Sequence, residues 1–481
     1  MDLTQCSKAE LIVRIEILQF ELDSLKKSIT GPRSERLIVI NPDQASIFPE
    51  DEGEVQEEIE TETITRTIKK KRSGKQPKRQ KMPTHLPIEI IILKPDIDVE
   101  GMEEIGVCES WKFEVTPPEI KVVKTIRTKY KDQAGNIHIA NLNDPFPKAN
   151  LGASFVALML VRKFIDHLPI YRQVKMWSRQ NVLLSRSVLN DSVAKGAIKL
   201  KLLFELLKTL ALQCDYLQAD ESSIPVLTED KPGSTLKGCM LIKLAPKEKI
   251  VLFDYIKTKE KVNILEALDG FSGHLQVDGN VSYESKGKQA DVTLMHCLVH
   301  SRRKFVVAMD YQKEKSSYVL DEIKKLYKIE KTCREENLNA DQIYQRRQKE
   351  ALPVLQQLKT YLLEQHQPNL PRNPFQKAVA YMLKRWDGLI EYTTNGHLLP
   401  DNNLIENQIR PLALGRKNYM FAGSHQGAFN AAILYSLLGT CKLNDINPYH
   451  WLKDVFLRID QHNVSKLEEL LPLKGYQFLN S

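Results

Sequence analysis

The sequence predicts a multidomain α/β protein in which a sheet-containing core is interrupted by a long helical insertion. Three observations support this prediction. Strand-like and helix-like segments alternate between residues 210 and 305, a charged region with helical periodicity spans 306–385, and the first 150 residues divide into segments of very different composition. The chain has 481 residues and a hydrophobic content of 42%, which is enough for several globular domains.

The composition favours a soluble protein of the cytoplasm. The net charge of +8 permits nucleic-acid binding without establishing it. The seven cysteines are scattered, and their odd number without a C-x-x-C pair argues for reduced thiols. The N-terminal sequence MDLTQCSKAE lacks the order of a signal peptide. Apolar runs fall short of the ~20 residues of a membrane span, so we expect no membrane partner.

Residues 1–40 are predicted to hold a coiled-coil helix that ends at Gly31-Pro32. Apolar residues between 8 and 30 alternate at spacings of four and three, which is a heptad seam. The alternative is an amphipathic helix belonging to its own domain. Self-association is favoured because the next segment is predicted to be unstructured, so we expect a homo-oligomer. The seam consists of Leu11, Ile15, Leu18, Leu22, Leu25 and Ile29.

Residues 41–87 are predicted to be a charged linker. An acidic block covers 50–62 and a basic block covers 66–81. Neither block can bury apolar surface, so both should be flexible in isolation. The basic block is equally compatible with a solvated tail and with a segment that lies along DNA phosphates or enters a minor groove.

Residues 88–148 are predicted to be a small β-rich module. The strand-like pieces are IEIIIL, WKFEVTP and IKVVKTIRTKY. The module has one cysteine, Cys108, and so it lacks the four Cys and His ligands of a structural zinc site.

Residues 149–200 are predicted to be a helix-turn-helix DNA-binding region. Helical patterns occur in FVALMLVRKFIDHL, YRQVKMWSRQN and SRSVLNDSVAK, with a break at Pro169 and a possible N-cap at Ser185. An ordinary helical bundle is the alternative. DNA binding is favoured because basic residues lie close together in the sequence. These candidates are Arg172, Lys175, Arg179 and Arg186.

The core is predicted to span residues 210–427 and to have a ribonuclease-H-like fold. The segments CDYLQADESSIPVL, GCMLIKLAP and KIVLFDYI read as an antiparallel meander. The helix VNILEALDGF and the strands HLQVDGN and VTLMHCLVH follow. In a ribonuclease-H-like fold the first and fourth strands lie side by side at the centre. This order would bring Asp220 in the first strand next to Asp278 at the end of the fourth.

A third carboxylate, Glu406, follows the helical insertion in the stretch DNNLIENQIRPLALGRKNYMFAGSHQG. Arg410 lies one helical turn later, and a surface ion pair is the ordinary explanation of this spacing. Arg416, Lys417 and Tyr419 follow at once, with two glycines after them, which is typical of a phosphate-binding environment. Residues 428–481 are predicted to be a C-terminal helical segment whose last twenty residues form a loose tail.

Together the three carboxylates predict a metal site. They are separated by 58 and 128 residues, so only a fold could assemble them. Each alone is better explained as a turn residue or a solvated side chain. Carboxylate oxygens suit Mg²⁺. Two such ions ~3.5–4 Å apart can activate a nucleophile, either water or a 3′-OH, and stabilise the leaving oxygen.

The chain resembles the DDE transposases of the insertion sequence 66 family over nearly its whole length. The resemblance implies Asp220, Asp278 and Glu406 as the catalytic and metal-binding triad, with two Mg²⁺ ions for which Mn²⁺ can substitute. The matching stretches, several of which occur in the order of the family, are FELDSLKKSITGPRSERL, KFIDHLPIYRQVKMWSRQNVLLSRSVLNDSV, LQADESSIPVL, LQVDGNVSY, CLVHSRRKF, DNNLIENQIRPLALGRKNYMFAGSHQGA and NPYHWLKDVFLRI.

The resemblance also implies an activity and partners. The protein is expected to bind the terminal inverted repeats of an insertion element, cleave their 3′ ends and join them to target DNA. Accessory proteins of the same element and a nucleoid-associated location in a bacterial cytoplasm are implied as well. The alternatives are a structure-selective nuclease of the same fold and a non-catalytic DNA-binding relic.

Further residues are candidates for contacts with DNA. Cys297 and His300 form a C-x-x-H pair with no second pair nearby, so zinc is not expected. His300 is predicted to touch a phosphate or a metal-bound water, although a core histidine beside a core thiol is an equal alternative. The remaining candidates are Arg302, Arg303 and Lys304 for the DNA backbone, Arg410 beside Glu406, and Arg416, Lys417 and Tyr419 for the DNA end.

The chain departs from the family pattern at several places. Many members carry a cysteine-rich zinc module near residues 90–140, where this chain has ILKPDIDVEG and YKDQAGN. We therefore expect a degenerate, zinc-finger-like module without its metal. Asn407 stands where the family often has Arg, and Ser192 where it often has Trp. These departures bear on the choice of DNA end more than on the chemistry.

Overall fold

The computed structural model describes residues 88–479 except 96, 101, 117–118, 148, 228–233 and 368–372. Before residue 88 it describes four positions, all helical: Ile15, Leu18, Gln19 and Leu22. The rest of the predicted coiled coil and the whole charged linker lie outside the described residues. The chain divides into two units, residues 1–81 and 82–481. Both sheets belong to the second unit, which is a mixed α/β structure.

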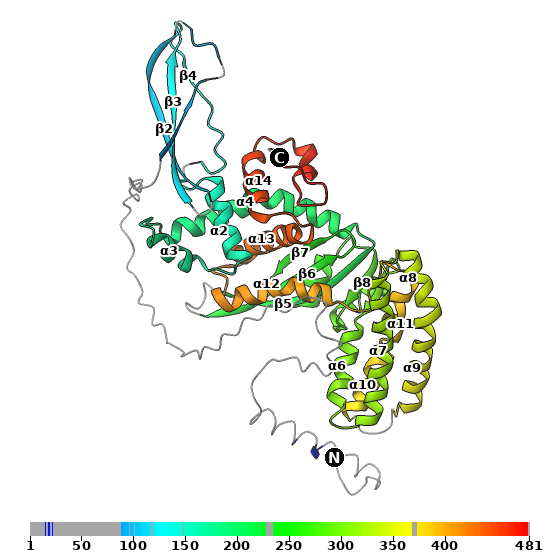
Figure 1. Cartoon of the computed structure of the whole chain (residues 1–481). Helices are drawn as coiled ribbons and strands as arrows, with labels where there is room; N and C mark the ends of the chain where they lie inside the picture. The colour runs from blue at the N-terminus through cyan, green and yellow to red at the C-terminus, as the bar shows by residue number, and fades with distance from the viewer. Residues whose placement is uncertain are drawn as a thin grey trace. The chain divides into compact units, whose positions relative to one another are not determined.

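The small β-rich module is present as a four-stranded sheet (Figure 1). The third strand along the chain pairs in parallel with the first strand and antiparallel with the second and fourth strands. Phe113 and Val122 join the main hydrophobic core, whereas Ile90 and Ile92 are exposed. The strands are β1 (Ile88–Leu93), β2 (Glu103–Thr116), β3 (Glu119–Lys131) and β4 (Ile137–Ile139).

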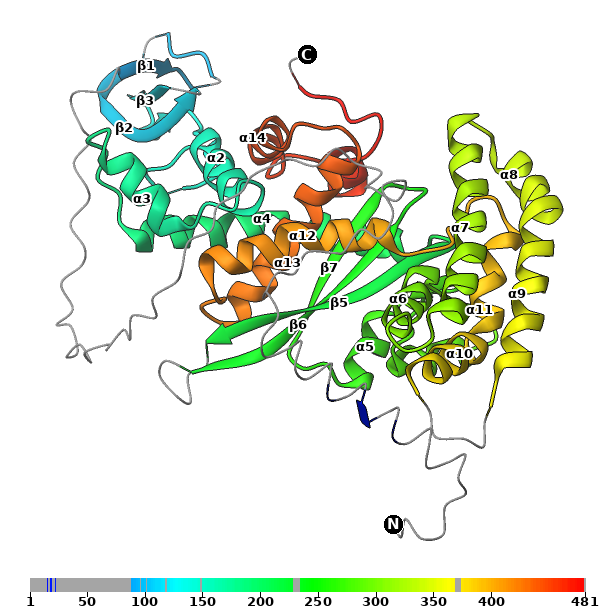
Figure 2. The ribbon, with the colours of Figure 1, turned by 60° about the horizontal axis from the view of Figure 1, so that its bottom comes forward.

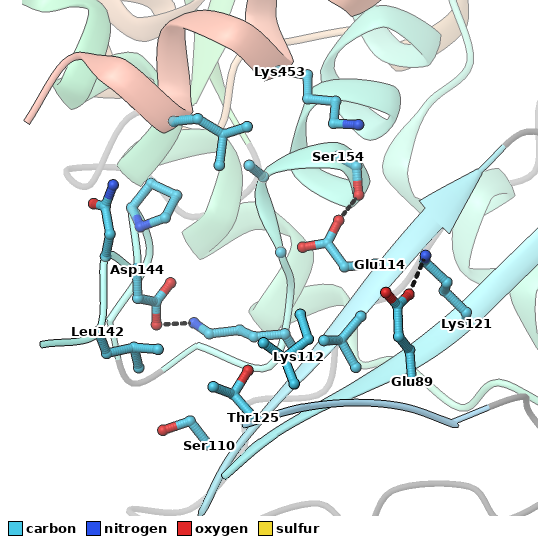
Figure 3. Close-up of a pocket in the computed structure, with 17 residues that line it drawn as sticks. Glu89, Ser110, Lys112, Glu114, Lys121, Thr125, Leu142, Asp144, Ser154 and Lys453 are labelled. Atoms are coloured by element: carbon cyan, nitrogen blue, oxygen red, sulfur yellow. Dashed lines mark hydrogen bonds and ion pairs between the residues drawn. The ribbon is translucent and has the colours of Figure 1, made fainter. Parts of the chain in front are cut away.

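A polar cavity of about 340 Å³ lies at the base of this module (Figure 3). Most of its charged side chains are already paired. Lys112 forms an ion pair with Asp144, and the Ser154 hydroxyl donates to Glu114. Burial raises the pKa of the Glu114 carboxyl above its usual range. Most charged side chains of the cavity therefore already have partners within the protein. None of the three predicted metal ligands lines the cavity.

Three helices follow the module. They are α2 (Ala153–Phe164), α3 (Ile170–Ser178) and α4 (Arg186–Leu212). Ser185 caps α4 by accepting a hydrogen bond of 3.2 Å from the amide of Val188, so the predicted N-cap is confirmed. The third helix has 27 residues and extends well past the predicted end at 195. Buried residues such as Leu200 and Leu207 continue its apolar face into the same core as the larger sheet.

The larger sheet, whose strands β5, β6 and β7 are labelled in Figure 2, has the strand order β7-β6-β5-β8-β9. β5, β6 and β7 are antiparallel neighbours, and β8 runs parallel to both β5 and β9. The predicted adjacency of the first and fourth strands is confirmed, since Tyr216–Gln218 pair with His274–Gln276. The elements are β5 (Tyr216–Leu227), β6 (Thr235–Ala245), β7 (Ile250–Ile256), α5 (Lys261–Ala267), β8 (Gly273–Val277) and β9 (Val292–His296), with short 3₁₀ turns at Val281–Tyr283 and Lys286–Lys288.

A helical bundle with its own core occupies the predicted insertion (Figures 1 and 2). Apolar residues such as Leu326, Leu358 and Phe375 fill this core, and the Arg347–Glu330 ion pair is buried beside it. The elements are α6 (Leu298–Ala308), α7 (Lys313–Glu335), α8 (Ala340–Arg346), a π-helical turn (Arg347–Ala351), α9 (Leu352–Gln365), α10 (Pro374–Lys384), α11 (Trp386–Ile390) and a 3₁₀ turn (Glu391–Thr394).

The C-terminal part returns the chain to the larger sheet. α12 (Asn403–Tyr419) packs on β5, α13 (His425–Leu443) packs on β7, and α14 (Pro448–Arg458) packs on α2. Among the helices that the structure describes, none is long and apolar enough to cross a membrane.

The predicted loose tail is wrong for most of its length. A 3₁₀ segment (Val464–Leu470) folds back on the core. Leu470 and Leu471 are buried, and the Leu470 carbonyl accepts a hydrogen bond of 3.1 Å from the indole of Trp451. Burial of the apolar side chains of Leu470 and Leu471 stabilises this segment against the core.

Candidate active site

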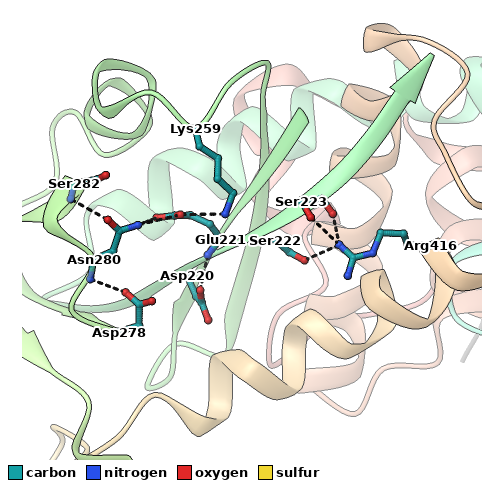
Figure 4. A network of polar contacts seen from close by, with 9 residues as sticks. All are labelled: Asp220, Glu221, Ser222, Ser223, Lys259, Asp278, Asn280, Ser282 and Arg416. Carbon is teal, nitrogen blue, oxygen red and sulfur yellow. Dashed lines mark hydrogen bonds and ion pairs between the residues drawn. The ribbon is translucent and has the colours of Figure 1, made fainter. Parts of the chain in front are cut away.

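Two of the predicted carboxylates lie on adjacent strands of the larger sheet. Asp220 lies within β5, and Asp278 directly follows β8, its parallel neighbour. Figure 4 shows both side chains beside the same stretch of sheet. The Asp220 carboxylate accepts a hydrogen bond of 2.6 Å from the Glu221 amide. That of Asp278 accepts one of 2.8 Å from the Asn280 amide, which closes the turn after β8.

The third carboxylate lies in the first turn of α12, where Glu406 pairs with α6. Its carboxylate is 3.1 Å from an Arg303 guanidinium nitrogen and 3.9 Å from Nε2 of His300. Arg410, the partner that its spacing suggested, is exposed one turn further along. Burial, followed by the charge of Arg303, lowers the pKa of His300, which favours a neutral imidazole.

Burial and the neighbouring carboxylates act on the protonation of Asp220. Burial raises the pKa of Asp220 to about 7, against 3.8 for an ordinary aspartate. The hydrogen bond from Glu221 opposes this rise, while the negative charges of Asp278 and Glu406 add to it. The charges of Asp278 and Glu406 thus act on the Asp220 carboxyl. Within the described part of the chain, however, no three acidic, histidine or cysteine side chains already converge as a metal cage.

A fourth carboxylate, Glu221, links β5 to the turn that bears Asp278. Its side chain is only 7% exposed and forms an ion pair of 3.3 Å with Lys259. The Asn280 side-chain amide donates to both of its oxygens at 3.3 Å (Figure 4). Glu221 directly follows Asp220 in β5. Strand alternation places it on the opposite face, which was a usable signal for a separate role.

The helical bundle contacts the Asp278 turn from the other side. The Tyr381 hydroxyl donates to the Asp278 carbonyl at 2.8 Å, and Arg385 donates to the Gly279 carbonyl at 2.7 Å. Gly279 has φ +96°, and a Cβ there would lie 2.6 Å from Nε of Arg385. The position therefore requires glycine. Lys304, a predicted DNA contact, places its ammonium 4.5 Å from the Tyr381 ring centre. No sequence pattern indicated a role for Tyr381 or Arg385.

The basic end of α12 is partly engaged within the protein. The Arg416 guanidinium donates to the Ser223 carbonyl and, at 3.3 Å, to the Ser222 hydroxyl, which holds α12 against β5 (Figure 4). The Tyr419 hydroxyl lies 3.2 Å from that of Tyr435. Lys417 is exposed. Of these candidates, Lys417 thus presents its charge to solvent, whereas Arg416 and Tyr419 contact other parts of the fold.

The remaining basic candidates lie on α3, α4 and α6. Arg172 is exposed and donates to the Asn418 side chain at 3.2 Å, which connects α3 to the end of α12. Arg302 is half-buried, and burial lowers its pKa. Lys175, Arg179, Arg186, Arg303 and Lys304 are exposed as well.

The C-x-x-H pair is divided between two environments. Cys297 is buried, and its sulfur accepts a hydrogen bond of 3.5 Å from the Asn402 amide at the start of α12. Burial raises the pKa of this thiol to about 12. His300 instead faces Glu406, so the two side chains contact different groups.

Comparison with known proteins assigns the chain to a class. The sequence model described as "Transposase IS66 family" matches residues 148–430, and "IS66 C-terminal element" matches 436–473. A third, "Transposase C of IS166 homeodomain", matches 17–91. The protein named "Uncharacterized protein y4jD" from Sinorhizobium fredii (strain NBRC 101917 / NGR234) is 29% identical over 98% of this chain and 96% of its own. "Uncharacterized protein y4hP" from the same strain is 27% identical over 95% and 88%.

The class is therefore that of transposases, because a transposase model matches more than half of the chain. More particularly, the chain belongs to the IS66 family, and the family predicted from the sequence motifs is confirmed. The homeodomain match indicates DNA binding by the N-terminal region, where a coiled coil and a linker were predicted. Nearly all of that region lies outside the described residues.

Proposed function

We propose that this protein is a DNA transposase whose catalytic residues are Asp220, Asp278 and Glu406. It would bind the ends of an insertion element, cleave their 3′ ends by metal-assisted phosphodiester hydrolysis and join them to target DNA. The observation that carries the proposal is the parallel pairing of β5, which bears Asp220, with β8, which ends directly before Asp278, while the Glu406 helix packs on β5. The negative charges of Asp278 and Glu406, far from Asp220 in sequence, thereby help to raise its pKa after the larger effect of burial.

We further propose that the larger sheet and its helices form a ribonuclease-H-like core. Three antiparallel strands are followed by two parallel ones, and the first strand is central. This order and the helical insertion before α12 support the assignment. In such a core the catalytic carboxylates come from the first strand, the fourth strand and a late helix, which is the distribution found for the three residues here.

The residues present fit a divalent cation. Asp220, Asp278 and Glu406 would hold it, because they offer the oxygen ligands that Mg²⁺ prefers. Burial, followed by the negative charges of Asp278 and Glu406, raises the pKa of Asp220, so a bound cation would favour its ionised form. The IS66 family belongs to the DDE transposases, which generally use divalent metals. Bound Mg²⁺, or Mn²⁺ in its place, would supply a more acidic water and stabilise charge on the leaving oxygen.

The basic side chains of the protein would position the DNA. Arg303 and Lys304 are exposed on the helix that faces Glu406, so they are suited to the phosphates nearest the reacting bond. Neutral His300 can exchange a hydrogen bond with a phosphate or a water. The other proposed DNA contacts are Arg172, Lys175, Arg179, Arg186, Arg302, Arg410, Arg416, Lys417 and Tyr419. A homo-oligomer and accessory proteins complete the proposal, because two element ends must be paired.

Cleavage and strand-transfer assays test the proposal. With DNA that carries an element end and MgCl₂, the wild type should cut the 3′ end and join a precleaved end to target DNA. Asp220→Ala, Asp278→Ala and Glu406→Ala should abolish both reactions and leave end binding intact. Asp269→Ala, which removes an exposed carboxylate beyond α5, is the matched control and should stay active.

Each alternative has its own signature in these assays. Clean cutting without joining would support a nuclease instead of a transposase. Specific end binding by a wild type that neither cuts nor joins would support a relic. Activity that survives loss of any of the three carboxylates would refute the proposed triad.

A further inference from the structure

We propose that Gln218 and Gln276 are positioning residues that set the place of Glu406 relative to the two aspartates. The inference rests on the proposed function. Gln218 lies two residues before Asp220 on β5, so the two project from the same face of the sheet, and Gln276 on β8 lies two residues before Asp278, which directly follows that strand. The two face each other in the register of β5 and β8, and both are 0% exposed.

The two side chains bond to each other and to the chain that enters α12. The Gln218 Nε2 atom donates to Oε1 of Gln276 at 2.9 Å and to the Asp401 carbonyl at 3.0 Å. Nε2 of Gln276 donates to the Leu399 carbonyl at 2.8 Å. The Tyr216 hydroxyl completes the cluster by donating to Oε1 of Gln276 at 2.5 Å. The entry to α12 is therefore tied to both strands that bear the aspartates.

The same cluster also caps the helix. The first amides of a helix need an acceptor, which the N-cap side chain usually supplies. Here the N-cap residue is Asn402, whose side chain makes no capping bond and has no hydrogen-bond partner for either polar atom. Gln218 supplies the acceptor instead, because its Oε1 receives the Ile405 amide at 3.2 Å. Ile405 directly precedes Glu406, so the cap fixes the helical turn that carries the third carboxylate.

A role limited to stability would be the simpler explanation, and the fold offers a matched comparison. On α13, the buried hydroxyls of Ser436 and Thr440 accept hydrogen bonds from the backbone of β7, at 2.7 Å from Phe253 and 3.2 Å from Val251. These contacts also hold a helix on a strand through buried side chains, but α13 bears no proposed metal ligand. Loss of Ser436 should therefore cost stability alone.

The expected effect follows from the geometric demands of the metal. Mg²⁺ requires near-ideal octahedral coordination. A displacement of about 1 Å in a reacting group can cost roughly 10²-fold in rate. Gln218→Met and Gln276→Met keep the side-chain length and remove the amide. Each should leave end binding at the wild-type level and slow Mg²⁺-dependent cleavage by roughly 10²-fold.

The experiment compares both variants with Ser436→Ala on the full chain. The melting temperature is measured in EDTA and then in MgCl₂, without DNA, and cleavage of end DNA is measured in parallel. Metal binding to the folded state raises the melting temperature. We expect this rise to shrink to less than about half in the glutamine variants and to stay at the wild-type value in Ser436→Ala.

The outcomes separate the inference from the proposed function. A wild-type metal response and cleavage rate in the glutamine variants would overturn the inference alone. The inference would also be overturned if Ser436→Ala, at the same stability as the glutamine variants, lost as much of its metal response and cleavage rate as they do. If Gln218→Met does not fold, Gln276→Met decides, because it keeps the cap on Ile405; failure of both to fold would make the role structural only. If the wild type has neither metal response nor cleavage, the proposed function fails and the inference fails with it.

Discussion

Replacing Asp220 by asparagine is expected to stabilise the metal-free protein at pH 8 while abolishing cleavage. The folded protein raises the pKa of Asp220 to about 7, whereas the unfolded chain should have the ordinary value of 3.8. The folded state therefore retains a proton that the unfolded state loses. The stability contributed by this group is complete below pH 4, falls as the pH rises, and is lost above the folded pKa.

The gap between 3.8 and about 7 corresponds to a free energy of ~4 kcal/mol at high pH, which is an upper bound. The asparagine side chain of the Asp220→Asn variant would mimic the protonated aspartate in size and can still accept the hydrogen bond from the Glu221 amide. The gain in free energy of unfolding should thus approach this bound at pH 8 and nearly vanish at pH 4. Magnesium should narrow the difference, because the wild type binds the ion and the variant does not.

Urea denaturation in EDTA at pH 4, 6 and 8 measures the effect. Asp269→Asn is the control, since that carboxylate is exposed and should show no pH-dependent gain. An Asp220→Asn protein that is equal to or less stable than the wild type at pH 8 would refute the reasoning. That result would mean that the fold compensates the carboxylate charge, and it would remove the electrostatic support for a cation site.

Three further predictions concern stability and DNA binding. Arg347→Leu should lower the free energy of unfolding by ~3–5 kcal/mol, because it leaves the Glu330 carboxylate buried without its partner; a loss below ~1 kcal/mol in urea denaturation would contradict this. Met420→Gly should raise the free energy of unfolding by ~1 kcal/mol, because Met420 has φ +68°. An unchanged or lower melting temperature would argue against backbone strain at Met420. Arg179→Ala should reduce the slope of log binding constant against log salt by ~0.9 if this exposed side chain contacts a phosphate; an identical slope would remove it from the DNA contacts.

The strands of the core could be predicted because their apolar pattern is strong and local. Residues 216–227 and 273–277 carry the sheet signal in their own sequence, and the order of elements was enough to pair them. The length of α4 could not be predicted in this way. Its predicted end at 195 precedes Gly196, whose missing side chain lets α2 approach, since a Cβ there would lie 3.1 Å from Leu160. Tertiary packing thus extends the helix past a residue that weakens helices.

The candidate site was partly predictable for the same reason. Asp220, Asp278 and Glu406 stand in recognisable stretches, whereas their supports depend on distant partners. Tyr381 bonds to a residue 103 positions away, and Gln218 to one 183 positions away. A single sequence contains no signal for such pairs. The last twenty residues were predicted to be loose because the apolar pair at 470–471 is too short to predict an element. In the structure this pair is buried beside Trp451.

The distance between the carboxylates along the chain also has a consequence during synthesis. Ribosomes add ~5–20 residues per second, so Glu406 emerges roughly 6–25 s after Asp278, with the helical bundle made in between. During that interval the nascent protein contains the two strands and their glutamines, but α12, the helix that Gln218 caps, has not yet been made. The proposed DNA-binding segments that precede the core are already complete, yet the chemistry must wait for the last part of the chain. If the proposed function holds, a newly made molecule would find DNA before it could cut it, and a chain released early would bind DNA without cleaving it.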